Sequence, residues 1–508
     1  MCFTFLLLLA TVGVLEAAVA QDEINDMPGL AKQPNFKQYS GYLKASGTKK
    51  LHYWFVESAG NPVKDPLVLW MNGGPGCSSV LGLLTEHGPF RINTDGKTVV
   101  YNPYSWNLLA NMLYLEAPAG VGFSYSDDKN YTTNDDEVAQ NNFLALKDFF
   151  SKYPEYSQNE FYVTGESYGG VYVPTLSALV VDDKEINFQG MAIGNGLSNY
   201  EFNDNSLIYF AYYHGLYDEV VWDSLVQNCC NGNATSRCMF TKGVSNQKCN
   251  DAVSLASQIV YSSGLNVYNL YGECAGGVQK RSIRFDAQRN KVVSNNFGWL
   301  LSNTDYIKKE FELLKTLAPG SLSLDPPCTN ATNVANYLNS LEGRQALHIP
   351  VQVQPWTTCS GEVNANYVRT YMEMSAQYKK ILAAKKRVLV YNGDVDMACN
   401  FLGDEWFIDD LDLDVVAGRM EWFYMAADGT KQVAGFVKQF KDLDLVTVRG
   451  SGHMVPTDRP IARSGNVNQK HSNSEICLVI SLFFIRRFKI KSLCERDKYF
   501  SWLLASSH

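Results

Sequence analysis

Residues 161–170 read FYVTGESYGG, a stretch that contains a Gly-x-Ser-x-Gly pattern centred on Ser167. Apolar and β-branched residues lead into the pattern, and an apolar, helix-compatible stretch follows at residues 171–181. A serine on a sharp turn between a strand and a helix is exposed for nucleophilic attack, and flanking glycines relieve the crowding of that turn. The stretch therefore predicts a nucleophilic serine at position 167. A glycine-bracketed turn with an incidental serine is the alternative.

The segments around this turn alternate between short apolar strands and helical patterns. Further strands are expected at residues 38–43, 51–57, 66–70, 111–116, 189–196, 387–391 and 443–448. A helical apolar spacing begins near Asn134 and ends at Pro154. This alternation is typical of an α/β fold, with a mostly parallel central sheet and helices on both faces. Near Asn199 the strands give way to a polar, cysteine-rich stretch, which predicts an inserted cap domain.

Two titratable residues follow expected strands. Asp396 comes after the strand at residues 387–391, and His453 comes after the strand at residues 443–448. The order serine, acid, histidine is that of the α/β-hydrolase triad. We therefore expect Ser167 to attack a carbonyl, His453 to act as general base and Asp396 to orient the imidazole. Asp394 is the competing acid, and Asp396 is preferred because it lies further into its loop.

A glycine-rich loop follows the buried strand expected at residues 66–70. It reads NGGPGC at residues 72–77. Glycines allow the backbone to approach a ligand closely, and the loop exposes N–H groups at the carboxyl end of the strand. The N–H groups of Gly74 and Tyr168 are expected to form an oxyanion hole. A simple tight turn is the alternative.

Composition and targeting features point to the secretory pathway. The apolar run at residues 3–19 predicts a cleaved signal peptide at residues 1–20, because the run is short for a membrane anchor. The formal net charge of −8 argues against nucleic acid and anionic membranes as partners. The cysteine cluster at residues 229–249 indicates disulfides rather than a metal site. Glycosylation sequons occur at Asn130, Asn233 and Asn330.

Four motifs taken together resemble the serine carboxypeptidase family. They are WMNGGPGCSS at residues 70–79, GESYGG at 165–170, NGDVDMACN at 392–400 and GSGHMVP at 450–456. The resemblance covers about residues 30–460. It implies an α/β-hydrolase fold and the release of C-terminal amino acids from peptides at acidic pH, with no cofactor. It also implies a clamp for the substrate carboxylate, formed by Asn72, Gly73, Glu86 and Glu166. Glu86 and Glu166 would share a proton.

The resemblance also implies disulfides and a domain organisation. The implied pairs are Cys77–Cys359, Cys229–Cys249, Cys230–Cys238 and Cys274–Cys328, which leaves Cys399 as a free thiol. The α/β-hydrolase core would occupy residues 21–199 and 328–460, and the cap residues 200–327. Residues 279–291 are polar and rich in basic residues and are expected to form an exposed loop and a candidate excision site. Residues 461–508 depart from the family pattern, and the apolar run at 476–485 is too short to span a membrane.

Two other functions stay open. An esterase or acyltransferase can use the same scaffold, and the resemblance also implies a non-catalytic protective partner of lysosomal glycosidases. Besides peptides with a free C-terminus and such glycosidases, a homodimer is a candidate partner. The expected location is lysosomal or secreted.

Overall fold

The computed structural model describes residues 20–234, 237–243, 245–277, 283–286, 291–294, 326, 328–426 and 428–460. The predicted signal peptide, apart from Ala20, and the segment at 461–508 lie outside the described residues. Of the expected loop and candidate excision site at 279–291, only residues 283–286 and 291 are described, and its role stays a prediction. Strand β11 (Ile283–Asp286) pairs antiparallel with β12 (Lys291–Ser294).

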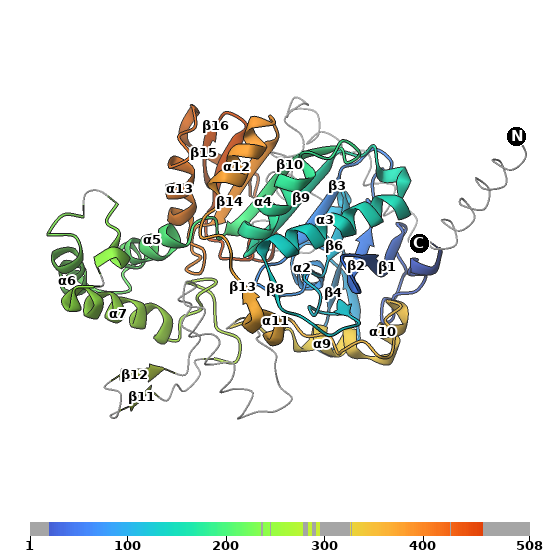
Figure 1. Cartoon of the computed structure of the whole chain (residues 1–508), viewed down its shortest axis with the longest axis horizontal. Helices are drawn as coiled ribbons and strands as arrows, with labels where there is room; N and C mark the ends of the chain where they lie inside the picture. The colour runs from blue at the N-terminus through green and yellow to red at the C-terminus, as the bar shows by residue number, and fades with distance from the viewer. Residues whose placement is uncertain are drawn as a thin grey trace, which may run out of the picture.

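An 11-stranded sheet forms the centre of the molecule (Figure 1). Its order is β1 (Gln38–Lys44), β2 (Lys49–Val56), β6 (Asn111–Leu115), β3 (Leu67–Met71), β9 (Phe161–Ser167), β10 (Phe188–Gly196), β14 (Arg387–Gly393), β17 (Leu443–Val448), β16 (Lys431–Phe440) and β15 (Val415–Met425), with β7 (Tyr125–Ser126) beside β2. The strands from β6 to β17 in this order are parallel, and antiparallel pairs close both edges. The predicted mostly parallel sheet is confirmed.

Strand β3 shows why the central strands are continuously apolar. Leu67 and Leu69 belong to the apolar cluster on one face of the sheet, and Val68 and Trp70 belong to the cluster on the other. Successive side chains of a strand point to opposite faces, so a strand covered on both sides must be apolar throughout. This double covering excludes water from both faces of the strands that carry the candidate site residues.

Helices cover the two faces in separate sets. The first set is α3 (Asp135–Lys152), α4 (Gly169–Val180), α12 (Ser375–Ala383) and α13 (Phe401–Asp409). The second is α2 (Ser79–Thr85) and α9 (Thr332–Asn339), and α10 (Leu341–Ala346) leads into Leu347 of the same apolar cluster. Smaller elements are β4 (Phe90–Ile92), β5 (Val99–Tyr101), β8 (Thr133–Asn134), β13 (Tyr367–Val368), α11 (Gly361–Asn366) and α14 (Val455–Asp458). Among the described residues, no helix combines the length and the apolar character needed to cross a bilayer.

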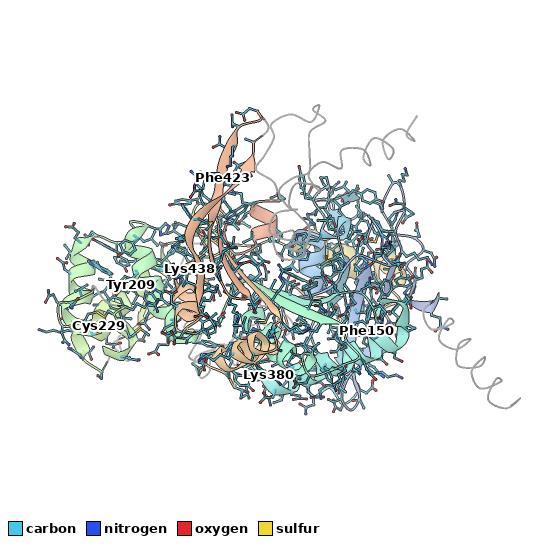
Figure 2. The ribbon with its side chains drawn as sticks, turned by 90° about the horizontal axis from the view of Figure 1, so that it is seen from above. Phe150, Tyr209, Cys229, Lys380, Phe423 and Lys438 are labelled. Atoms are coloured by element: carbon cyan, nitrogen blue, oxygen red, sulfur yellow. A yellow bond between two sulfur atoms is a disulfide. The ribbon has the colours of Figure 1, made fainter. Side chains whose placement is uncertain are left out.

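Three helices extend away from the sheet. They are α5 (Tyr200–Tyr213), α6 (Glu219–Cys229) and α7 (Gln247–Ser262), at the left of Figure 1. Figure 2 places Tyr209 and Cys229 in this part. These helices share an apolar cluster that also contains Val395 and Met397, on either side of Asp396. They lie in the region where the cap was expected, and the cap boundaries at residues 200 and 327 stay a prediction.

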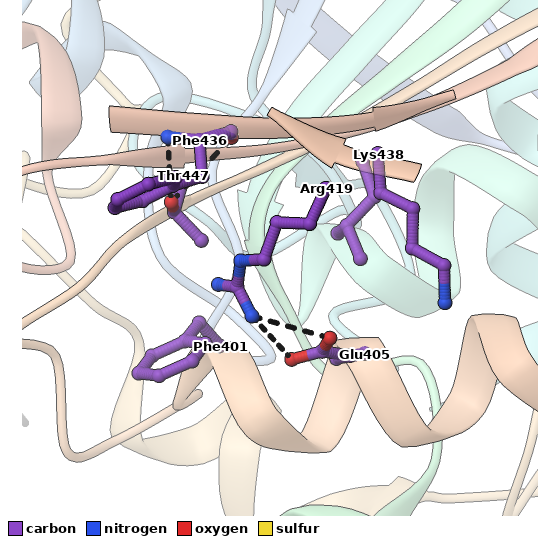
Figure 3. Close-up of a pocket in the computed structure, with 7 residues that line it drawn as sticks. Phe401, Glu405, Arg419, Phe436, Lys438 and Thr447 are labelled. Carbon is purple, nitrogen blue, oxygen red and sulfur yellow. Dashed lines mark hydrogen bonds and ion pairs between the residues drawn. The ribbon is translucent and has the colours of Figure 1, made fainter. Parts of the chain in front are cut away.

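Two ion pairs connect α13 to the long β15–β16 hairpin. Figure 2 labels Phe423 near the end of this hairpin. Arg419 of β15 lies 3.3 Å from Glu405 of α13 (Figure 3), and Lys438 of β16 lies 2.7 Å from Asp409. Exposed pairs of this kind contribute about 0–1 kcal/mol each. They orient the hairpin on the helix more than they stabilise the fold.

Candidate active site

The turn at Ser167 has the backbone that a nucleophile elbow requires. Strand β9 ends at Ser167, α4 begins at Gly169, and Ser167 has a φ of 61°. A positive φ is strained for a residue with a side chain. A Cβ on Gly165 would lie 2.4 Å from the Met71 carbonyl oxygen, and one on Gly170 would lie 2.4 Å from the Leu197 nitrogen. The glycines around the serine are therefore required by the packing of the turn.

The structure pairs His453 with Asp396. The Nδ1 atom of His453 lies 2.7 Å from Asp396 Oδ2, and both side chains are buried. Asp396 also accepts hydrogen bonds from the backbone N–H groups of Ala398 and Cys399. Asp394, the competing acid, instead accepts a hydrogen bond from the Gly450 N–H at 2.6 Å. The geometry therefore favours Asp396 over Asp394 as the group that orients the imidazole.

Asn195 is a residue of this site that the sequence analysis missed. Its Nδ2 donates to Asp396 Oδ2 at 2.9 Å, and its Oδ1 accepts from the Gly393 N–H at 2.9 Å. It lies in β10, between β9, which ends at Ser167, and β14, which ends three residues before Asp396. Its only mark in the sequence is its position between two glycines at the end of an expected strand. The side chain holds the Asp396 loop against the end of β10.

Residues 267–268, in the expected cap, contact both the loop that carries Asp396 and the loop that carries His453. The sequence analysis did not identify this segment. The carbonyl of Tyr268 accepts the His453 N–H at 2.7 Å, and the carbonyl of Val267 accepts the Met397 N–H at 3.0 Å. The rings of Tyr268 and His453 have centroids 4.9 Å apart. A Cβ on Gly452 would lie 2.1 Å from the Tyr268 carbonyl oxygen, so this close approach requires glycine.

The residues expected to bind a substrate carboxylate form a buried cluster. The Asn72 Nδ2 donates to Glu166 Oε1 at 2.8 Å and to Glu86 Oε1 at 3.2 Å. The Asn72 Oδ1 accepts hydrogen bonds from Trp70 Nε1 and from the Gly82 N–H. These two donors fix the orientation of the amide, so its NH₂ group faces the carboxyls.

The two carboxyls of this cluster favour a shared proton. Burial raises the pKa of Glu166 well above its usual range, and the neighbouring Glu86 carboxyl raises it further. Burial also raises the pKa of Glu86. Two adjacent carboxyls away from water resist ionising together, because each charge disfavours the other. The segment after His453 contacts this cluster directly, because the Thr457 hydroxyl donates to the carbonyl of Thr85, the residue before Glu86, at 3.1 Å.

The glycine-rich loop packs directly on the Ser167 turn. A Cβ on Gly73 would lie 2.3 Å from the Tyr168 nitrogen and 2.8 Å from Ser167 Cβ. Gly74 has a φ of 117°, a conformation that only glycine adopts readily. Within the described part of the chain, no backbone carbonyl accepts the N–H of Gly74 or Tyr168. Both N–H groups are thus available to a ligand, as an oxyanion hole requires.

The cysteines form the four pairs that the resemblance implied. They are Cys77–Cys359, Cys229–Cys249, Cys230–Cys238 and Cys274–Cys328. Cys399 is free and buried, and burial raises the pKa of its thiol. The described residues contain no group of His, Cys, Asp and Glu arranged to hold a metal ion. The sequons Asn130, Asn233 and Asn330 are all exposed, as glycosylation would require.

A further buried carboxyl, Asp404, lies near Asp396. The Asn392 Nδ2 donates to it at 2.8 Å, and burial raises the pKa of Asp404 to about 7. An aspartate in an unfolded chain has a pKa of about 3.9. Between these two values the folded protein binds more protons than the unfolded chain, so the free energy of unfolding falls as pH rises. The contribution of Asp404 to the free energy of unfolding is therefore expected to be larger in acid and to be lost as pH rises through about 7.

We expect the thermal midpoint to be a few degrees higher near pH 5 than near pH 8. The Asp404→Asn variant should show a smaller difference, because the amide cannot ionise. Asp410→Asn is the matched control, since Asp410 is the C-cap of the same helix and is exposed. Thermal unfolding followed by circular dichroism at several pH values gives the change of the thermal midpoint with pH for each variant. If the thermal midpoint of Asp404→Asn changes with pH as much as that of the unmodified protein, Asp404 is not the group responsible.

The family model for serine carboxypeptidases matches residues 28–470. The lysosomal protective protein of Mus musculus is 53% identical over 458 residues, which cover 90% of this chain and 95% of that protein. A serine carboxypeptidase of Caenorhabditis elegans is 42% identical, with coverage of 87% and 92%. A prohormone-processing carboxypeptidase of Saccharomyces cerevisiae has a similar structure, with a TM-score of 0.64, 21% identity and coverage of 87% and 94%. The structural likeness shows a shared fold.

Proposed function

The chain belongs to the serine carboxypeptidase family, and we propose that it releases C-terminal amino acids from peptides at acidic pH. The observation that carries the proposal is the buried contact of Asn72 with Glu86 and Glu166, close to the His453–Asp396 pair. A carboxyl pair that shares a proton can donate a hydrogen bond to the free carboxylate of a substrate. An internal peptide bond offers no such group, so the cluster selects chain ends.

In the proposed reaction, the Ser167 oxygen attacks the carbonyl carbon of the last peptide bond. His453 accepts the serine proton on Nε2, and Asp396 holds the Nδ1–H and stabilises the imidazolium. The N–H groups of Gly74 and Tyr168 bind the oxygen of the tetrahedral intermediate. His453 then gives its proton to the leaving amine, which departs as the free amino acid. Water, activated by the same histidine, hydrolyses the acyl-enzyme.

The clamp determines the pH dependence of substrate binding. While pH lies below the raised pKa of the pair, one carboxyl keeps its proton and donates to the substrate carboxylate, together with the Asn72 amide and the Gly73 N–H. As pH rises through that pKa, the proton is lost, and the pair repels the substrate. The KM for a peptide with a free C-terminus should therefore increase with pH.

The Glu166→Gln variant tests this clamp. Glutamine keeps a permanent donor and removes the titration, so its KM should change only a few-fold between about pH 4 and pH 8. The KM of the unmodified enzyme should rise by about tenfold or more, because the repulsion costs a few kcal/mol. The measurement is release of the C-terminal residue from an N-blocked dipeptide with an apolar last side chain.

Glu160→Gln is the matched control, since Glu160 is exposed and directly precedes β9, the strand that carries Glu166. It should keep the pH profile of the unmodified enzyme. Equal pH dependence of KM in Glu166→Gln and in the unmodified enzyme would rule out the clamp. No release at any pH from correctly folded enzyme would rule out the proposed function itself.

The same proposal includes a secretory location, lysosomal or extracellular. Four disulfides support it, because such bonds persist in oxidising compartments. The exposure of the three sequons is compatible with glycosylation on that route. The stability expected in acid from Asp404 also fits an acidic compartment.

A further inference from the structure

A buried carboxylate next to the Ser167 turn belongs to neither the triad nor the clamp. Asp135 is 1% exposed. Its Oδ1 accepts hydrogen bonds from the hydroxyls of Tyr168 and Tyr367, each at 2.8 Å. Its Oδ2 accepts the backbone N–H groups of Thr370 and Tyr371, at 2.6 and 3.1 Å. A carboxylate with four donors has a fixed position and orientation.

The start of α3 and the short β8–β13 pairing together place Asp135. It is the first residue of α3, after the N-cap Asn134, where the helix dipole favours a negative charge. The two residues before it form β8, which pairs with β13 at Tyr367–Val368. This pairing brings a segment more than 200 positions away in the sequence onto the carboxylate.

The contact with Tyr168 connects Asp135 to the catalytic turn. Tyr168 follows Ser167 directly, and its backbone nitrogen lies against Gly73. Its hydroxyl is held by Asp135, and the Arg369 guanidinium lies 5.8 Å from the centre of its ring. With the side chain fixed at its far end, the peptide between Ser167 and Tyr168 has little freedom to rotate.

We propose that Asp135 is a positioning residue that holds the Tyr168 N–H toward the oxyanion through the Tyr168 hydroxyl. The inference rests on the proposed acyl-enzyme mechanism, in which this N–H stabilises the tetrahedral intermediate. Loss of one oxyanion donor typically lowers kcat by about 10²–10³-fold. A variant that loosens the Tyr168 N–H without removing it should lose less, with kcat lowered by about tenfold to 100-fold.

The test compares two tyrosines that donate to the same oxygen of Asp135 at the same distance. Tyr168→Phe and Tyr367→Phe each remove one hydroxyl and leave one equivalent hydrogen bond. If Asp135 only stabilises the fold, both variants should lose similar thermal stability and similar activity. If it positions Tyr168, kcat should fall by about tenfold to 100-fold in Tyr168→Phe, with KM within about threefold. Tyr367→Phe should then keep kcat within about threefold.

Binding of a peptidyl boronate, which forms a tetrahedral adduct with the serine, gives an independent readout. Its affinity should fall in Tyr168→Phe in proportion to kcat, because both depend on the oxyanion donor. Asp135→Asn should also lower kcat, and adding Tyr168→Phe to it should cost less than Tyr168→Phe alone. Asp136→Asn, a change at the next residue of the same helical turn, should leave kcat unchanged.

Equal loss of kcat in the two phenylalanine variants would overturn the inference, and so would a change in KM alone. Additive effects of Asp135→Asn and Tyr168→Phe would also overturn it. These outcomes differ from a failure of the proposed function, in which the unmodified enzyme itself would not release C-terminal residues.

Discussion

Replacement of Ser167 by alanine is expected to lower kcat for C-terminal release by about 10⁶-fold. The variant has no nucleophile, so the acyl-enzyme cannot form. Residual hydrolysis would depend on substrate binding and the oxyanion hole acting on water. The side chain is not needed for the turn, because the positive φ at this position is imposed by the packing of β9 and α4. We therefore expect the variant to fold and to bind peptide products normally.

The measurement is steady-state release from an N-blocked dipeptide near pH 5, with product affinity determined by inhibition of the unmodified enzyme or by calorimetry. Ser177→Ala is the matched control, a buried serine on α4, the helix that follows the turn. It should retain activity. The double variant Ser167→Ala with His453→Ala should be no less active than Ser167→Ala alone, because the two residues act as a unit. More than about 1% residual kcat in Ser167→Ala would contradict the assigned nucleophile.

The second large effect is expected at Asp396. Asparagine in its place should lower kcat by about 10⁴-fold, because the wrong imidazole tautomer is then stabilised. Asp396 accepts the His453 Nδ1–H, and an amide would present donors in a position that already faces Asn195 Nδ2 and two backbone N–H groups. The buried site offers no alternative acceptor from solvent, since Asp396 has no exposed surface.

Asp394→Asn is the matched control for this variant. Asp394 lies two residues earlier in the same loop and contacts the Gly450 N–H rather than the imidazole. Its replacement should change kcat by less than about tenfold, since it alters only a hydrogen bond to the Gly450 N–H in the loop that carries His453. Comparison of kcat/KM for the two variants decides between the acids. A larger loss in Asp394→Asn than in Asp396→Asn would reverse the assignment.

The sequence alone was sufficient to predict those features whose determining residues are contiguous in the chain. The strand, the glycines and the helix around Ser167 are contiguous, so the turn could be predicted without knowledge of any distant residue. The chain order of Ser167, Asp396 and His453 added the rest of the predicted triad, because parallel strands end at the same edge of a sheet. The choice of Asp396 over Asp394 depended only on its position further into the loop, and the contact with His453 gives the choice a physical basis.

Other parts of the site depend on contacts between distant segments, which a single sequence does not reveal. Asn195 reaches Asp396 across 201 positions, and Asp135 reaches Thr370 across 235. In the sequence, Asp135 is simply an acidic residue in the first turn of a helix, and Tyr268 is one tyrosine among many. Glu86 was expected only from the resemblance to the family, because its own surroundings favour an ordinary helix residue. Its role depends on Asn72 and Glu166, which come from two other elements.

The most direct test of the central claim compares two N-blocked dipeptides that differ only at the C-terminus. One carries a free carboxylate and the other a C-terminal amide, and release of the last residue is measured by chromatography near pH 5. The clamp predicts that kcat/KM for the free acid exceeds that for the amide by about 100-fold or more, because the amide cannot replace the charged partner. Ser167→Ala should release neither product. Equal rates for the two dipeptides, or release by Ser167→Ala, would contradict a serine carboxypeptidase that selects free C-termini.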